Sequence, residues 1–489
     1  MLPDCYLFPR AGSSGLSLPP SYIMKISTLR GLFVAGALCT LALTASAQVV
    51  ELRATINAAQ ENNPANSSPA TGTAIMLFDV RANTFDLIVS ITGMTNTATN
   101  SHIHEAAAGA NGGVVTNLGA EAVYTRSGSN LTATFRNVTH GGDKLKLLQG
   151  GAYFNIHSAQ YPGGEVRGQL IPRPVRLVAS LDAAQEQAAV PTPVLTGVNN
   201  FGGAVLVYDP MANTISIRHS LFLFNNTFSN SHIHTGAPGV SGPARTQLGA
   251  SATAGAYSSA NGHISGAHDN IPLIDDPIAL LTGGMYLNYH STTFGAGQLR
   301  GQITVSKEAL ATRFGNLSIR GFVGGGEQVL IGGLSITGTE PVRTLITAKG
   351  PSLAAFGVTG AVANPRLDLF DSAGRLIASN DDVGPIAAGS DLSRIPSVPT
   401  NGVESALVVV LPPGNYTAQV SAATGTGVAL LETYDLRSLG AAGITVSALG
   451  APTPMRAASL AVAKPTSSTV KTALKLCAAV PLAVTVAGR

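Results

Sequence analysis

The chain has 489 residues, enough for about three domains, and only 11% of them are charged. This composition is too apolar for a disordered chain, and the 55 glycines favour short strands joined by tight turns. The net charge of +3 is small and Lys and Arg do not cluster, which excludes a nucleic-acid-binding surface and a polybasic membrane patch.

Residues 1–47 are expected to be an upstream segment and a signal peptide. Lys25 and Arg30 supply a positive charge, an apolar run follows, and Ala45-Ser46-Ala47 is a small-residue cleavage site before Gln48. The apolar run is too short to span a bilayer comfortably. We therefore predict an exported protein, secreted or in the cell envelope, without a stable membrane span in the mature chain.

Residues 48–172 and 173–306 are predicted to be two copies of one domain, because short motifs recur in the same order with small insertions. In the first copy the motifs are Ala58-Ala59-Gln60-Glu61, Asn100-Ser101-His102-Ile103-His104, Tyr153, Asn155, His157-Ser158 and Arg167-Gly168-Gln169. In the second copy they are Ala183-Ala184-Gln185-Glu186, Asn230-Ser231-His232-Ile233-His234, Tyr286, Asn288, His290-Ser291 and Arg300-Gly301-Gln302.

Each copy is expected to fold as an all-β domain. Thr73 to Val80 and Thr84 to Ile91 are apolar or β-branched runs separated by a turn, and Tyr161-Pro162-Gly163-Gly164 is typical of a hairpin. Short strands with turn signals at this density predict an antiparallel β-sandwich or barrel.

Residues 307–437 are predicted to form a different, jelly-roll-like β-sandwich. Strand-like segments such as Val329 to Ile336 and Ala406 to Leu411 alternate with turns such as Pro412-Pro413-Gly414. Residues 438–489 are rich in Ala, Thr and Pro, and we expect a low-complexity, poorly ordered tail there.

Six of the ten histidines are duplicated with the repeat. Residues two apart share a face of a strand, so the His-x-His pair of each copy and the distant third histidine could converge. Such a triad suits zinc or copper. The simpler alternative is structural, with each imidazole hydrogen-bonded to loop backbone, because duplication copies structural residues equally well. The candidate metal ligands are His102, His104 and His157, and His232, His234 and His290.

The third domain carries acidic residues at turns. Asp371 and Asp381-Asp382 could hold calcium. Turn chemistry of Asp side chains between strands explains the same pattern, and calcium ranks behind zinc or copper as a cofactor.

The duplicated unit resembles the CHRD domain, first described in chordin. The resemblance implies an extracellular β-sandwich module without established catalysis, in a family whose animal members bind growth factors. Ala296 and Gln298 depart from the pattern. The matching segments are Ser101 to His104, Gly109 to Val115, Tyr153 to His157 and Gly163 to Gln169, and in the second copy Ser231 to His234, Gly239 to Pro243, Tyr286 to His290 and Gly297 to Gln302.

Two shorter resemblances concern other parts of the chain. His102 to Glu105 is similar to the metal-binding strand of Cu/Zn superoxide dismutases, although the remaining ligands and the disulfide of that family have no counterpart here. Leu369 to Asp382 and Leu411 to Tyr416 resemble the pre-peptidase-type C-terminal sandwiches of bacterial secreted proteins, which are accessory modules.

The sequence therefore predicts a secreted, non-enzymatic protein with a binding or structural role, whose tandem domains present loops to an extracellular protein or polysaccharide. No phosphate loop, nucleophile elbow or Cys-x-x-Cys pair occurs in the sequence. The alternative is a metalloprotein that uses the histidine triads for metal storage or for simple redox or hydrolytic chemistry.

Overall fold

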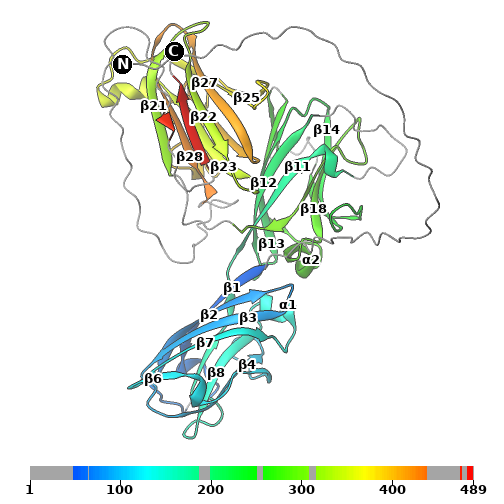
Figure 1. Ribbon diagram of the computed structural model, residues 1–489, viewed down its shortest axis with the longest axis vertical. Helices are drawn as coiled ribbons and strands as arrows, with labels where there is room; N and C mark the ends of the chain where they lie inside the picture. Colours follow the sequence, from blue (N-terminus) through cyan, green and yellow to red (C-terminus); the bar gives the residue numbers. More distant parts are fainter. Residues whose placement is uncertain are drawn as a thin grey trace, which may run out of the picture. The chain divides into compact units, whose positions relative to one another are not determined.

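The computed structural model describes residues 48–63, 65–186, 199–249, 257–260, 262–307, 315–437, 474–475 and 482–487. The expected signal peptide lies outside the described residues. The described chain is nearly all β, as the sequence predicts, and its strands fall into two ten-stranded sheets and a two-sheet domain (Figure 1). Within these ranges, no helix has the length and apolarity needed to cross a membrane.

The first domain is one antiparallel sheet with the strand order β5-β4-β8-β9-β1-β2-β3-β7-β6, and β10 pairs with β1. Apolar residues at alternate positions, such as Leu52, Met76 and Phe154, are fully buried on its inner face. Its elements are β1 (Val49–Asn57), β2 (Thr71–Asp79), β3 (Thr84–Thr92), β4 (Ala98–Glu105), β5 (Gly113–Asn117), β6 (Thr125–Ser127), β7 (Asn130–Thr139), α1 (Lys144–Leu148), β8 (Ala152–Ser158), β9 (Val166–Gln169) and β10 (Ile171–Pro172).

The second domain repeats this topology strand for strand, with the order β15-β14-β18-β19-β11-β12-β13-β17-β16 and β20 paired with β11. The duplicated motifs thus lie on equivalent strands of the two sheets. Its elements are β11 (Val175–Asp182), β12 (Phe201–Asp209), β13 (Thr214–Phe222), β14 (Phe228–Thr235), β15 (Ala244–Gly249), β16 (Tyr257–Ala260), β17 (His263–Pro272), α2 (Pro277–Leu281), β18 (Met285–Ser291), β19 (Leu299–Gln302) and β20 (Thr304–Val305).

The third domain is a sandwich of two sheets, β21-β28-β23-β26 and β25-β24-β27-β22-β30-β29. Val323 and Ile346 from the first sheet share one buried cluster with Leu334 and Leu367 from the second. Its strands are β21 (Asn316–Val323), β22 (Leu330–Ile336), β23 (Val342–Lys349), β24 (Asn364–Phe370), β25 (Leu376–Asn380), β26 (Ser405–Leu411), β27 (Gly414–Thr424), β28 (Gly427–Asp435), β29 (Leu474–Lys475) and β30 (Leu482–Ala487).

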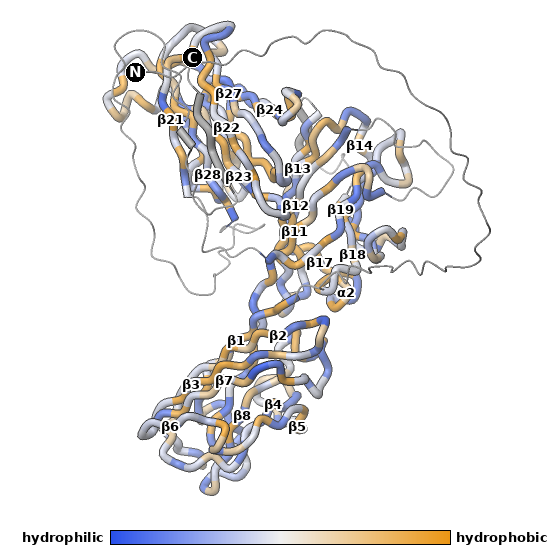
Figure 2. Tube along the Cα trace, viewed as in Figure 1, coloured by the Kyte–Doolittle hydropathy of each residue, from blue (hydrophilic) through white to orange (hydrophobic). Residues whose placement is uncertain are grey.

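Two of these strands come from the segment 438–489, in which we expected a poorly ordered tail. β30 pairs antiparallel with β22, with Ile331 opposite Ala487, and extends that sheet. The apolar and β-branched composition of Leu482–Ala487 suits a strand. Along many strands of the chain, hydrophobic and hydrophilic residues alternate (Figure 2), the pattern that distinguishes a buried face from an outer one.

Candidate metal centre

Strands β4 and β8, which lie side by side in the first sheet, carry the three candidate ligands of that domain (Figure 1). His102 is opposite Asn155, and Asn100 is opposite His157 in the register of the two strands. Ile103 points into the core and is fully buried, so His102 and His104 share the outer face with His157. One nitrogen from each of the three rings lies within 4.8 Å of the others.

Two of these rings are oriented by backbone carbonyl groups. Nδ1 of His104 lies 3.0 Å from the carbonyl oxygen of Gly112, and Nδ1 of His157 lies 3.0 Å from that of Pro162. An Nδ1–H group donated to a carbonyl leaves Nε2 with a free lone pair, which is the form that binds a metal ion. Nε2 of His104, Nε2 of His157 and Nδ1 of His102 are all buried without a hydrogen-bond partner among the described residues.

The second domain repeats this arrangement on β14 and β18. His232 is opposite Asn288 and Asn230 is opposite His290, the same register as in the first domain. Nδ1 of His234 lies 2.9 Å from the carbonyl oxygen of Gly242, and Nδ1 of His290 lies 3.1 Å from that of Gly295. The three rings again bring one nitrogen each within 4.8 Å of the others.

The hydrogen bonds to backbone that we expected of a structural role are therefore present at two rings of each triad, and they occupy only one nitrogen of each of those rings. In a tetrahedral site with bonds of 2.0–2.1 Å, the ligand nitrogens lie roughly 3.3 Å apart. Nδ1 of His232 and Nε2 of His290 are 3.1 Å apart, close to that spacing. The other ligand nitrogens lie within 4.8 Å of one another, so a bound ion would draw some of the rings closer together.

Glycine is required at the position that orients the second histidine. A Cβ atom on Gly112 would lie 2.1 Å from the carbonyl oxygen of Glu105, and one on Gly242 would lie 1.7 Å from that of Thr235. No side chain fits at either distance, because the obstruction is backbone. The close approach that only glycine permits brings the carbonyl group within reach of the imidazole.

A stack of three side chains supports His104 from the other side. The ring of Tyr153 is parallel to the His104 ring, with centroids 4.8 Å apart and planes 6° apart. The Arg167 guanidinium lies over the opposite face of Tyr153, 3.4 Å from its centroid. The second domain has the same stack, in which Arg300 lies 3.5 Å from the centroid of Tyr286.

The duplicated Arg-Gly-Gln motif also holds the loop that precedes Gly112. Arg167 donates to the carbonyl oxygen of Ala107 at 3.2 Å, and Nε2 of Gln169 donates to that of Ala106 at 2.9 Å. The hydroxyl of Tyr153 accepts from the Gly112 N–H at 3.3 Å. These bonds position the Gly112 carbonyl and, through it, the ring of His104.

A carboxyl group lies beside this stack. Glu61, from the duplicated Ala-Ala-Gln-Glu motif, accepts a bond of 3.4 Å from Nδ2 of Asn155. Burial raises the pKa of Glu61 to about 7, against the opposing effects of Arg167 and Asn155. The neighbouring Gln60 accepts from the N–H of Gln169, which ties the two duplicated motifs together.

Burial favours the neutral form of five candidate ligands. It lowers the pKa of His102 and of His232 to about 4, and the adjacent imidazoles lower it further in both cases. Burial also lowers the pKa of His104, His234 and His290. A neutral ring is required of a metal ligand, since a protonated imidazole has no lone pair to offer.

A β-bulge accompanies each His-x-His pair. In the pairing of β4 with the edge strand β5, Ile103 is opposite Thr116, whereas His104 is opposite Val114. The extra residue on β5 is Val115. The register of β14 and β15 shifts at the equivalent place, between Ile233 and His234. Bulges of this kind re-aim side chains and are common beside functional sites.

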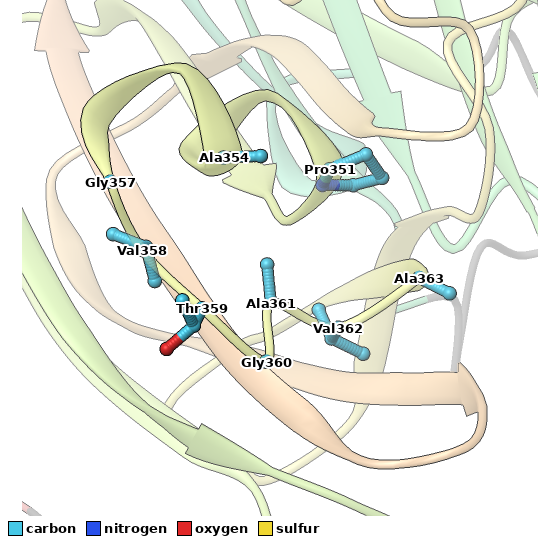
Figure 3. A pocket seen from close by; sticks show the side chains of 9 residues that line it. All are labelled: Pro351, Ala354, Gly357, Val358, Thr359, Gly360, Ala361, Val362 and Ala363. Carbon is cyan, nitrogen blue, oxygen red and sulfur yellow. The ribbon is translucent and has the colours of Figure 1, made fainter.

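Two other features contribute no comparable site. Asp371 accepts from the backbone N–H groups of Ala373 and Arg375 and pairs with the Arg375 guanidinium at 2.7 Å, as turn chemistry predicts. A shallow pocket of the third domain, within residues 351–363, is lined by apolar side chains and Thr359 (Figure 3). It offers no titratable group.

Sequence reasoning missed three histidines in the second domain that lie outside the triads. His219, His263 and His268 are buried, and the rings of His219 and Tyr289 meet edge to face at 4.9 Å. The first domain has Val89 at the position of His219. A comparison of the two copies position by position would have revealed these substitutions.

Fold and site together define a protein with two tandem antiparallel β domains, each carrying a buried cluster of three histidines. The CHRD domain matches residues 52–170 and 177–303, which together make up half of the chain. The chain therefore belongs to the CHRD domain family. CHRD domains are extracellular-type β domains without a known catalytic role. No curated protein matches the chain.

Proposed function

We propose that the chain is an exported, non-enzymatic protein that binds one transition-metal ion, zinc or copper, in each CHRD domain. The observation that carries the proposal is the convergence, in both copies, of three imidazole nitrogens within 4.8 Å. In the first domain all three are buried and unpartnered among the described residues. An unpaired buried polar atom costs about 1–3 kcal/mol, which a bound ion would recover.

The donor set favours zinc or copper over calcium. Three imidazoles and no carboxylate suit borderline ions, whereas calcium takes six to eight oxygen ligands. The carbonyl groups of Gly112 and Pro162 would act as the outer partners that fix each ring in the metal-binding tautomer. Three protein ligands leave a fourth position for water or another ligand.

Export and the third domain complete the proposal. The signal peptide in residues 1–47 would direct the chain out of the cytoplasm, as the extracellular nature of CHRD domains supports. The third sandwich would serve as an accessory module of the pre-peptidase type, and the loops of the tandem domains would meet an extracellular protein or polysaccharide.

Metal content and calorimetry of the full mature chain test the proposal. We expect two equivalents of Zn²⁺ or Cu²⁺ per chain. Replacing His102, His104 and His157 with Ala should reduce the stoichiometry to one and leave the second domain as an internal control. His140→Ala, at a buried histidine outside the triad, is the matched control and should leave it at two.

Failure of the wild-type chain to bind either ion, with the fold intact by circular dichroism, would disprove the proposal. Bound metal that survives loss of both triads would also contradict it. The alternative of simple redox or hydrolytic chemistry predicts turnover by the copper- or zinc-loaded chain that disappears in the triad variants.

A further inference from the structure

The two histidine clusters differ at the residue that faces their first histidine from the edge strand. His102 is opposite Asn117, whereas His232 is opposite Gln247. Gln247 hydrogen-bonds the ring of His232. Nδ1 of His232 lies 3.1 Å from Nε2 of His290, so Nδ1 points into the cluster and Nε2 is the nitrogen left for Gln247.

This contact would hold His232 in the form that a metal ion needs once an ion binds Nδ1. When Nε2–H is donated to the carboxamide oxygen of Gln247, the lone pair remains on Nδ1, the nitrogen that points into the cluster. All three imidazoles of the second domain then have an outer partner, because Gly242 and Gly295 orient the other two.

The first domain lacks the equivalent partner. Asn117 is one methylene shorter than Gln, and its Oδ1 accepts from the N–H of Gly119 at 3.2 Å. No hydrogen bond joins it to His102 among the described residues, and Nδ1 of His102 is unpartnered there. His102 therefore has no outer partner of this kind among the described residues.

The second cluster is also more enclosed. His290 is 8% exposed, whereas its counterpart His157 is only half-buried. Enclosure reduces competition from water and slows the loss of a bound ion. Both differences favour tighter metal binding by the second domain.

We propose that the two metal sites are graded, with a retentive site in the second domain and an exchangeable site in the first. The inference rests on the proposed metal binding and names Gln247 and Asn117 as the positioning residues that set the difference. An outer partner of a metal-bound histidine typically changes affinity about 10–100-fold. The dissociation constants for zinc should differ by about that factor.

The experiment uses the full mature chain with Zn²⁺ alone, titrated against a competing chelator. Two single-site chains report the sites separately: Ala at His102, His104 and His157 isolates the second site, and Ala at His232, His234 and His290 isolates the first. We expect the isolated second site to bind at least about 10-fold more tightly and to release zinc to excess chelator more slowly.

Reciprocal exchange then tests the cause. Asn117→Gln should tighten the first site and Gln247→Asn should loosen the second, each by about 10-fold or more. Gln247→Glu is the conservative control, because it keeps an acceptor opposite His232 and should preserve tight binding. A structural role of Gln247 alone would instead lower thermal stability without changing zinc release.

Equal affinity of the two single-site chains would overturn the grading and leave metal binding standing. Reciprocal variants without effect on zinc affinity would overturn the role of Asn117 and Gln247. If the chain bound no zinc at either site, the proposed function itself would be disproved, and not only the difference between the sites.

Discussion

Buried histidines should make the second domain sensitive to acid. Burial lowers the pKa of His268 from 6.5 to about 4 and holds the pKa of His219 well below 6.5, with Arg218 adding to the effect. The His268 ring faces His219 at 5.7 Å, and Asp269 opposes part of the shift. At mildly acidic pH the unfolded chain therefore binds protons at these two histidines, whereas the folded domain does not.

The sign and size follow from linkage. A histidine with a lowered folded-state pKa does not reduce the free energy of unfolding above pH 6.5. The reduction grows as the pH falls from 6.5 to 4. At pH 5 the unfolded chain has almost completed protonation, so His268 alone should remove about 2 kcal/mol of stability. His219 should add to this loss.

The perturbation replaces both rings with the residues of the first domain. Phe135 and Val89 hold the positions of His268 and His219 in the paired strands, so the double variant is His219→Val with His268→Phe. Urea unfolding at pH 7 and pH 5, read by pulse-labelling hydrogen exchange, follows each domain separately.

We expect the loss of stability of the second domain between pH 7 and pH 5 to shrink by at least about 2 kcal/mol in the double variant. His263, whose pKa burial lowers to about 4, remains and should keep a residual slope. His268→Phe alone should remove part of the effect. An unchanged pH dependence in the double variant would refute the reasoning.

Three further outcomes are expected. Gly112→Ala should weaken zinc binding at the first site about 10–100-fold, because the added Cβ meets the carbonyl group of Glu105 and displaces the carbonyl group that orients His104. Calorimetry of the single-site chain measures the affinity, and an unchanged affinity would contradict this prediction. Arg167→Met should weaken zinc binding at the same site, because it removes the hydrogen bond from Arg167 to Ala107 that holds the loop before Gly112, and it should have little effect on the second site. An equal loss of affinity at both sites would argue for general destabilisation. N-terminal sequencing of the exported chain should return Gln48, and a chain that begins at Met1 would show that no cleavage occurs.

The two-copy architecture could be predicted because the same short motifs recur in the same order along the chain. The face-sharing of His102 and His104 follows from the two-residue period of a strand, and so does that of Asn155 and His157. The pairing of β4 with β8 is a long-range contact between segments about fifty residues apart, which periodicity does not encode. The convergence of the triad therefore needed the structure.

Hydrogen bonds from the imidazoles to loop backbone were expected, but the residues that supply the carbonyl groups could not be predicted, for a similar reason. Gly112 and Pro162 act through backbone carbonyl groups, and a carbonyl group leaves no signature in residue identity. The role of Gly112 depends on the path of a neighbouring loop, which Arg167 and Gln169 determine from a distant strand. Sequence reasoning assigned neither Gly112 nor Pro162 a role in orienting a histidine.

The bulge opposite His104 has a consequence for how copies of this protein meet one another. β5 is an end strand of its sheet, and an end strand exposes backbone donors and acceptors that another chain could recruit into a continuous sheet. The bulge at Val115 interrupts the regular spacing of those groups, and the strand is only five residues long. The irregularity that aims an imidazole therefore also discourages aggregation along this border, a useful property for a chain expected to fold away from cytoplasmic chaperones.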